Sequence, residues 1–159
     1  MIIRDATPDD AAEACAVLRA SIIQLCTADH HDDPDILGRW LANKTPENVA
    51  AWADAKGRSL LVAVDDGSIA AVGGVSDSGE ITANYVAPRA RFRGVSASLL
   101  AALEMRAVER GARQATLLST WTAHRFYLAC GYQVTGPPQS KFGTTASYPM
   151  AKALAGVMP

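Results

Sequence analysis

The chain has 159 residues, a length that fits one domain with its own hydrophobic core. Hydrophobic residues make up 49% and charged residues 19%, a composition typical of globular proteins and not of disordered ones. The formal net charge is −1, so the chain has no overall field that would attract nucleic acid or anionic lipid. We therefore expect a single domain over residues 1–159, with neither nucleic acid nor a membrane as a partner.

The three cysteines, Cys15, Cys26 and Cys130, are odd in number and show no CxxC spacing. This argues against a disulfide framework and against a thiolate zinc site. The N-terminus has no basic segment followed by an apolar run, and no stretch approaches the roughly 18 apolar residues that span a bilayer. We expect free thiols in a reducing cytoplasm, in a protein that is neither exported nor inserted.

The first third of the chain predicts one strand followed by helices. Residues 2–6 read as a short strand, and Thr7-Pro8-Asp9-Asp10 then provides an N-cap, a proline at the first helical position and an acid at the third. Apolar residues recur every three or four positions as far as Cys26, which predicts an amphipathic helix. A polar loop over 29–34 and two short helical segments follow, the second opened by Thr45-Pro46.

The rest of the chain alternates strands with helices. Turns at Asp65-Asp66-Gly67 and Asp77-Ser78-Gly79 separate three apolar strands, so two antiparallel hairpins share the middle strand. The later elements are a helix over 94–111, a strand over 113–118, a helix over 122–130 and strands over 132–134 and 147–151. This order predicts an α/β (α+β) fold, with a mixed, mostly antiparallel central sheet of six to seven strands and helices on both faces.

The junction between residues 86 and 96 is a candidate anion site. It carries the end of a strand through a turn directly into a helix, whose first N–H groups have no internal partners and lie at the positive end of the helix dipole. Gly94 and Ser96 leave the backbone open, while Arg91 and Arg93 add charge that suits a pyrophosphate. A solvated helix start is the alternative interpretation.

Two motifs give the chain a resemblance to a known family. Arg91-x-x-Gly94-x-Ser96 resembles the Q/R-x-x-G-x-G/A motif of the GNAT acetyltransferases, whose backbone amides hold the pyrophosphate of coenzyme A, although Ser96 stands where the family usually has Gly or Ala. The segment 122–132 is similar to the family's A-x-x-F-Y-x-x-x-G-F/Y, where the alternative is that Phe126 and Tyr127 simply pack a helix on the sheet. The resemblance spans roughly residues 59–152.

The resemblance implies the GNAT fold and an acetyl-CoA dependent N-acetyltransferase that works by direct transfer to a primary amine, without a metal and often as a homodimer. It implies that Tyr127 protonates the leaving thiolate, that the Val86 N–H stabilises the charge on the thioester oxygen, and that Glu80, directly or through water, takes the amine proton. The strand's period of two places Asn84 on the face of Glu80, where it would contact the substrate, and Tyr85 on the other. The implied cofactor contacts are Tyr85, Val86, Arg91, Phe92, Arg93, Gly94, Val95, Ser96, Ala97, Ala123 and Phe126.

The alternatives concern one loop and the chemistry itself. Residues 29–33 are Asp-His-His-Asp-Asp, metal-ligand types, but adjacent residues rarely face one ion and a solvated acidic loop is the better interpretation. In the family this loop borders the acceptor site, so Asp29 is expected to attract a cationic amine. Glu80 could be just an exposed carboxylate at a hairpin end, and Trp40, Trp52 and Trp121 could line the acceptor site or only pack. A non-catalytic acetyl-CoA-binding module remains the competing function. An acetyltransferase directed at tRNA would require a basic surface, which the balanced charge does not indicate.

Overall fold

The computed structural model describes residues 1–155, so the last four residues of the predicted domain lie outside the described part. The strands are β1 (Ile2–Asp5), β2 (Arg58–Asp65), β3 (Ser68–Ser76), β4 (Ile81–Val86), β5 (Gln114–Ser119), β6 (Gln133–Val134) and β7 (Tyr148–Ala153). The helices are α1 (Ala11–Leu25), α2 (Thr27–His30), α3 (Pro34–Leu41), α4 (Pro46–Asp54), α5 (Val95–Glu109) and α6 (His124–Ala129). Short 3-10 turns at Pro8–Asp10 and Pro88–Ala90 precede α1 and α5.

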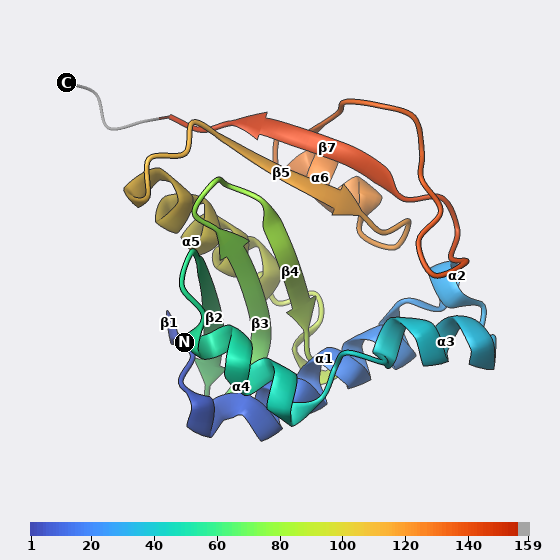
Figure 1. The fold of residues 1–159 in the computed structure, drawn as a ribbon, viewed down its shortest axis with the longest axis horizontal. Coiled ribbons are helices and arrows are strands. Elements are labelled where there is room, and N and C mark those ends of the chain that lie inside the picture. The colour runs from blue at the N-terminus through green and yellow to red at the C-terminus, as the bar shows by residue number, and fades with distance from the viewer. Residues whose placement is uncertain (156–159) are drawn as a thin grey trace.

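The seven strands form two sheets that spread apart from one another (Figure 1). One sheet has the order β1-β2-β3-β4 and the other the order β5-β7-β6, and all the pairings within them are antiparallel. The predicted α/β fold with mostly antiparallel strands is confirmed, with the difference that the strands do not form one continuous sheet. The discontinuity falls between β4 and β5, which lie next to each other but pair through a single bridge.

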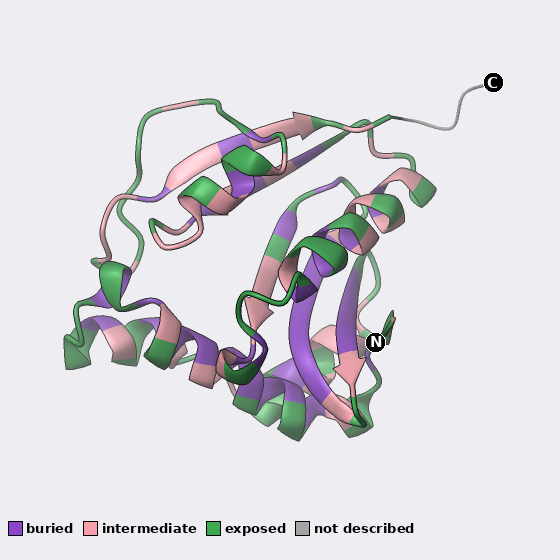
Figure 2. Cartoon of the chain, turned by 180° about the vertical axis from the view of Figure 1, so that it is seen from behind, coloured by how far each residue is buried: buried purple, intermediate pink, exposed green. Residues whose placement is uncertain are grey.

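Helices cover both faces of the first sheet. Helix α5 packs on β2, β3 and β4 from one side, while α1 and α4 pack from the other. The close approach of α5 requires Gly73 on β3, because a Cβ there would come within 2.8 Å of a Leu103 methyl group and 3.0 Å of a Leu99 methyl group. Leu99 and Leu103 are fully buried at this contact, and Figure 2 shows the buried residues concentrated along the central strands beneath the helices.

Local sequence signals set the ends of these elements. Asp66 and Gly67 both have positive φ, at 51° and 75°, which makes the tight β2–β3 hairpin turn that the Asp-Asp-Gly sequence predicts. The Thr45 hydroxyl accepts a hydrogen bond from the Asn48 N–H at 3.2 Å, which caps α4 as predicted. Most of the element boundaries follow the predicted ones closely. The exceptions include a short helix, α2, where a loop was expected.

Helix α5 also ties the two sheets together at its far end. The Glu104 carboxylate accepts a hydrogen bond from the Tyr132 hydroxyl at 2.7 Å and pairs with the Lys152 ammonium group of β7 at 3.1 Å. Tyr132 is almost fully buried, so these contacts lie in a sheltered environment where charge-assisted hydrogen bonds are strong. One end of the second sheet is therefore held on α5, while the other end of that sheet is separated from β4.

Candidate functional site

The candidate site lies in the split between β4 and β5. The two strands run parallel and touch at their starts, where Glu80 bridges Thr116 and the Thr116 N–H donates to the Gly79 carbonyl at 2.9 Å. No further ladder joins them among the described residues, so the strands separate toward Val86 and Ser119. Edge groups of both strands that a continuous sheet would pair are therefore available inside a wedge-shaped opening.

A cavity of about 460 Å³ occupies the α5 face of this split, and we refer to it as the α5 cavity. Both sequence motifs line it: the turn into α5 forms one wall and α6 with its preceding turn forms the other. All the predicted cofactor contacts except Arg93 are among its lining residues. Residues that the sequence did not predict complete the wall, namely Ser21, Leu25, Cys26, Ala90, Thr120 and Thr122.

The start of α5 presents unpaired backbone donors to the α5 cavity. The first backbone hydrogen bond of the helix is donated by Ser98 to the Gly94 carbonyl, and no side chain caps the helix, so the amides of Val95, Ser96 and Ala97 have no partner among the described residues. Gly94 has a φ of 76°, which turns the chain into the helix. Nothing lies within 4 Å of a Cβ built at Gly94, so the approach to these amides is open. Such a helix start binds anions.

The two arginines of the turn have different environments. Arg91 lines the α5 cavity, and its guanidinium lies 4.5 Å from the centre of the Phe92 ring, which is itself 91% exposed. Arg93 does not line the cavity and instead forms an ion pair with Asp65 at 3.6 Å. The prediction that both side chains serve the anion site is therefore corrected for Arg93, whose guanidinium points to the end of β2.

The backbone of β4 directs the Val86 N–H into the split. The Ala87 N–H donates to the Ala70 carbonyl at 2.7 Å, and Val86 lies opposite Ala71 in the register of β3 and β4. Because donors alternate between the two sides of an antiparallel strand, the Val86 N–H points away from β3 and toward β5. It is available to an oxygen atom bound in the split.

Asn84 and Tyr127 meet at the inner end of the α5 cavity. Both residues also line a small cavity of about 60 Å³ between β4 and β5. Burial raises the pKa of the Tyr127 hydroxyl to about 12, and the nearby Asn84 amide opposes that rise. The Asn84 Oδ1 atom is buried and has no hydrogen-bond partner among the described residues. The pair thus offers a protonated phenol and an unused acceptor at one point.

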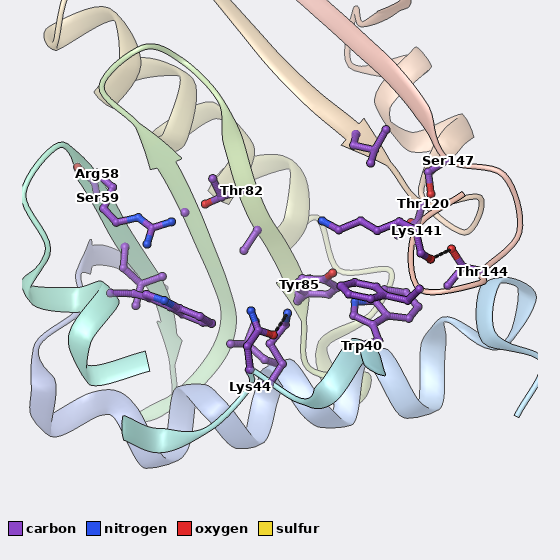
Figure 3. A pocket seen from close by; sticks show the side chains of 18 residues that line it. Trp40, Lys44, Arg58, Ser59, Thr82, Tyr85, Thr120, Lys141, Thr144 and Ser147 are labelled. Atoms are coloured by element: carbon purple, nitrogen blue, oxygen red, sulfur yellow. Dashed lines mark hydrogen bonds between the residues drawn. The ribbon is translucent and has the colours of Figure 1, made fainter. Parts of the chain in front are cut away.

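A second cavity, of about 290 Å³, opens on the opposite face of the split (Figure 3). We call it the basic cavity because it is lined by Lys44, Arg58 and Lys141 and by no acidic residue of the described chain. Aromatic side chains from three segments, Trp40, Trp52 and Phe142, form its apolar walls. Burial, followed by the charge of Lys141, lowers the pKa of Lys44 to about 8.

The two large cavities converge on the same strand residues. The small cavity shares Asn84, Ala123 and Tyr127 with the α5 cavity, and Thr82, Ala83 and Leu118 with the basic cavity, while Tyr85 and Thr120 line all three. Both large cavities therefore border the small cavity within the split, one on each face.

Glu80 lies at the closed end of the split and not at its opening. Glu80 is exposed and lines none of the cavities described above. Four positions separate it from Asn84, which is about 13 Å along an extended strand. The predicted alternation fails because Gly74 pairs with Ala83 and Val75 with Ile81, which leaves Thr82 as an extra residue in β4. The prediction of Glu80 as the base beside the substrate is corrected accordingly.

Asp29 is buried in the protein and does not face an acceptor. Its carboxylate accepts hydrogen bonds from the Trp121 N–H at 2.7 Å, from the Thr122 N–H at 3.1 Å and from the Thr122 hydroxyl. It is 1% exposed and lines none of the described cavities, so the predicted role in attracting a cationic amine is wrong. Asp29 instead holds the 120–123 turn, which forms part of the α5 cavity wall.

The neighbouring histidine of this loop is also structural. The His30 Nε2 atom lies 2.9 Å from the Ile22 carbonyl, and its Nδ1 atom accepts from the Asp32 N–H at 2.9 Å. Among residues 1–155 no three His, Cys, Asp or Glu side chains are grouped as metal ligands would be, and no helix is both long and apolar enough to cross a membrane.

Of the residues left undecided by the sequence, Trp40 and Trp52 line the basic cavity, whereas Trp121 lines none of the described cavities. The three cations of the basic cavity were not predicted. They come from β2, from the segment between α3 and α4, and from the loop between β6 and β7, so no local sequence pattern connects them.

Comparisons with known proteins agree with this geometry. The family model described as "Acetyltransferase (GNAT) domain" matches residues 36–154. The chain is similar to the GCN5-related N-acetyltransferase from Rhodopseudomonas palustris, with 29% identity, coverage of 96% of this chain and 95% of that one, and a TM-score of 0.84. It also shares its fold with the PaiA N-acetyltransferase from Thermoplasma acidophilum in complex with coenzyme A, at 16% identity, coverage of 96% and 98%, and a TM-score of 0.80.

A third structure, ribosomal-protein-alanine N-acetyltransferase from Brucella melitensis, has 23% identity, coverage of 97% of this chain and 100% of that one, and a TM-score of 0.74. None of the curated protein sequences matches the chain. The family match covers well over half of the residues and includes both motifs that line the α5 cavity. This chain therefore belongs to the GNAT family of N-acetyltransferases.

Proposed function

We propose that this protein transfers an acetyl group from acetyl-CoA to a primary amine by direct attack within a ternary complex. The observation that carries the proposal is that two cavities on opposite faces of one split share Tyr85 and Thr120 and both border the small cavity that Asn84 and Tyr127 line. A two-substrate transfer without a covalent enzyme intermediate requires both substrates to be present side by side. The α5 cavity would take the cosubstrate and the basic cavity the amine.

The α5 cavity has the features that coenzyme A requires. The free amides of Val95, Ser96 and Ala97 and the charge of Arg91 suit the pyrophosphate, and the mostly apolar wall beyond them suits the pantetheine arm. Similar structures support this assignment, since those from Thermoplasma acidophilum and Salmonella typhimurium contain coenzyme A and acetyl-CoA respectively.

Acetyl-CoA supplies the acetyl group as a thioester. Three groups of the chain, from Asn84, Val86 and Tyr127, would act on the reacting atoms. The Asn84 Oδ1 atom accepts a hydrogen bond from the incoming amine and thereby aligns its lone pair, because it is the unpartnered buried acceptor at the junction. The Val86 N–H faces the oxygen on which negative charge develops, and the Tyr127 hydroxyl faces the sulfur.

The proton balance follows from these positions. As the amine nitrogen forms its bond to the acetyl carbon and the carbon–sulfur bond breaks, the Tyr127 hydroxyl gives its proton to the departing thiolate. The nitrogen releases one proton to solvent as it becomes an amide, and Tyr127 regains one from solvent. A phenol with a pKa of about 12 is protonated throughout the physiological range, as this role demands. An alkyl ammonium, with a pKa near ~10, must lose its proton first. No carboxylate lines the described cavities, so we assign that proton to solvent in the open basic cavity and leave Glu80 out of the reaction.

A non-catalytic acetyl-CoA-binding module is the competing function. Release of coenzyme A and formation of acetylated product, measured by mass for a panel of amines, separates the two, with coenzyme A affinity measured in parallel by calorimetry. The proposal expects turnover of at least one amine at a rate well above that of thioester hydrolysis. Tight coenzyme A binding with no acetylated product from any amine would favour the module.

A further inference from the structure

We propose that the acceptor is a small primary amine that carries carboxylate groups, with its acid groups bound by Arg58, Lys44 and Lys141 and its amine directed toward β4. This inference rests on the proposed function, because it assigns the acceptor of that same reaction. It concerns the basic cavity, whose chemistry the family membership leaves open.

The charge of the basic cavity is entirely of one sign. Arg58 of β2, Lys44 between α3 and α4, and Lys141 between β6 and β7 reach into it from three sides (Figure 3). None of the three forms an ion pair within residues 1–155, so no acidic side chain of that range neutralises the cavity. Converging cations without an acidic partner are the arrangement expected where a ligand supplies the negative charge.

The neighbours of Lys44 show that this charge is not neutralised by the protein. Its Nζ atom donates to the Asn43 side-chain oxygen at 2.8 Å, and its own carbonyl accepts from the Arg19 guanidinium at 3.0 Å, which adds another cation nearby. Lys44 is only partly exposed, and the charge of Lys141 acts on it unfavourably. A bound carboxylate would relieve the repulsion among these cations.

The geometry also excludes the opposite kind of acceptor. A polyamine would bring further positive charge into a space that already holds three cations and no acid. The one acid that the sequence offered for cation binding, Asp29, is buried and engaged by Trp121 and Thr122. The cavity volume of about 290 Å³ and its aromatic walls, Trp40 and Trp52, suit a molecule of amino-acid size.

The amine end of such a molecule would lie at β4. The basic cavity is lined on the side of the split by Thr82, Ala83 and Tyr85. The Asn84 Oδ1 atom next to them has no hydrogen-bond donor among the described residues. With its acid groups at the cations and its nitrogen at Asn84, the acceptor would span the cavity from rim to junction. Charge would then select the acceptor and Asn84 would orient it.

The test compares amines that share one carbon skeleton. Glutamate, glutamine and the diamide of glutamate carry two, one and no carboxylates, and putrescine serves as a cationic comparison. With saturating acetyl-CoA, kcat/KM per free-base amine is expected to fall about tenfold or more for each carboxylate removed, as for a charge-assisted hydrogen bond. A preference for the diamide or for putrescine would overturn the inference while leaving the acetyltransferase assignment intact.

Two variants connect the preference to the cavity. Arg58→Gln and Lys141→Gln are expected to raise KM for glutamate about tenfold, with kcat and the KM for acetyl-CoA changed less than about twofold. Arg113→Gln is the matched control, since Arg113 is exposed and lines none of the described cavities. Equal effects of all three substitutions, or no effect of the first two, would contradict the inference.

Failure of the chemistry can be told apart from failure of this inference. If no amine is acetylated, the proposed function is refuted, and the fluorescence of Trp40 and Trp52 still reports glutamate binding to the protein saturated with coenzyme A. Binding that Arg58→Gln and Lys141→Gln weaken, and Arg113→Gln does not, would support the anionic acceptor on its own. No binding of glutamate at millimolar concentration would refute it.

Discussion

The Asn84 side chain and the Tyr127 hydroxyl lie close together in the split between β4 and β5, where the amide opposes the rise in the pKa of the hydroxyl, and both residues line the α5 cavity and the small cavity inside the split. Asn84 lies on β4 of the first sheet, whereas Tyr127 lies on α6, behind β5 and β7 of the second sheet. The relationship therefore depends on how far the two sheets are held apart, which α5 fixes through Glu104.

Tyr127→Phe is expected to lower kcat about 100-fold, because it removes the proton donor while keeping the ring that fills the wall. The KM for acetyl-CoA should stay within about twofold, since the phosphate contacts are at the other end of the cavity. Steady-state kinetics with a fixed amine measure both. Tyr148→Phe is the control, as Tyr148 is a partly buried tyrosine that lines none of the described cavities. An unchanged kcat in Tyr127→Phe would remove Tyr127 from the reaction.

Glu80→Gln is expected to change kcat/KM less than about threefold and to leave its pH profile in place, because Glu80 is exposed at the closed end of the split. The measurement is the pH dependence of kcat/KM from 6 to 9.5 for both proteins. A loss of 100-fold or more, with disappearance of an acidic limb, would show that Glu80 acts as the base after all.

Gly94→Ala is expected to raise the KM for acetyl-CoA about tenfold. The substitution adds a Cβ at a residue with φ of 76°, which strains the turn that presents the α5 amides, although no protein atom lies within 4 Å of the new group. Gly67→Ala provides a matched control, since Gly67 has a φ of 75° and equally open surroundings but lies in the β2–β3 turn. Both should lose about 1 kcal/mol of stability, and only Gly94→Ala should lose cosubstrate affinity. A KM that rises equally in both would reject the anion site at α5.

Asp29→Asn is expected to lower the free energy of unfolding by about 2 kcal/mol, because an amide can no longer accept hydrogen bonds with both oxygens from Trp121 and Thr122. Thermal denaturation should show a Tm lower by roughly 4–8 °C. Asp32→Asn is the control, at a side chain that is 76% exposed. If Asp29→Asn kept its stability and altered only the KM for the amine, Asp29 would contact the acceptor as the sequence first suggested.

Lys44 provides a prediction for pH. Its pKa of about 8 lies below the ordinary value because of burial and then the charge of Lys141, so Lys44 is cationic below pH 8 and neutral above it. Affinity for the unreactive product N-acetylglutamate should therefore fall about three- to tenfold between pH 7 and 9, as Lys44 loses its charge in the basic cavity. Tryptophan fluorescence titrations measure this, and Lys44→Gln should abolish the pH dependence. An affinity that rises with pH would contradict an anionic acceptor.

The sequence predicted the parts of this protein that depend on local signals. The hairpin at Asp66 and Gly67, the cap at Thr45 and the turn at Gly94 each require particular residues at particular positions, and each is found where the pattern indicated. The two motifs at 91–96 and 122–132 were likewise sufficient to indicate the walls of the α5 cavity. These features need no knowledge of distant contacts.

The errors arose where distant contacts decide. A bulge that leaves Thr82 unpaired broke the alternation that was to place Glu80 beside Asn84, and nothing in the composition of the strand marks it. Which acid of the 29–33 loop is buried depends on the donors of Trp121 and Thr122, about ninety residues away. The basic cavity, assembled from three separate segments, could be recognised only in three dimensions.

The most direct test is a crystal structure of the protein with coenzyme A and glutamate bound. The account predicts the pyrophosphate within hydrogen-bond distance of the Val95, Ser96 and Ala97 amides, the sulfur beside Tyr127, and the amine of glutamate at the Asn84 oxygen. Coenzyme A bound with its thiol outside the split, or with its pyrophosphate away from the start of α5, would contradict it.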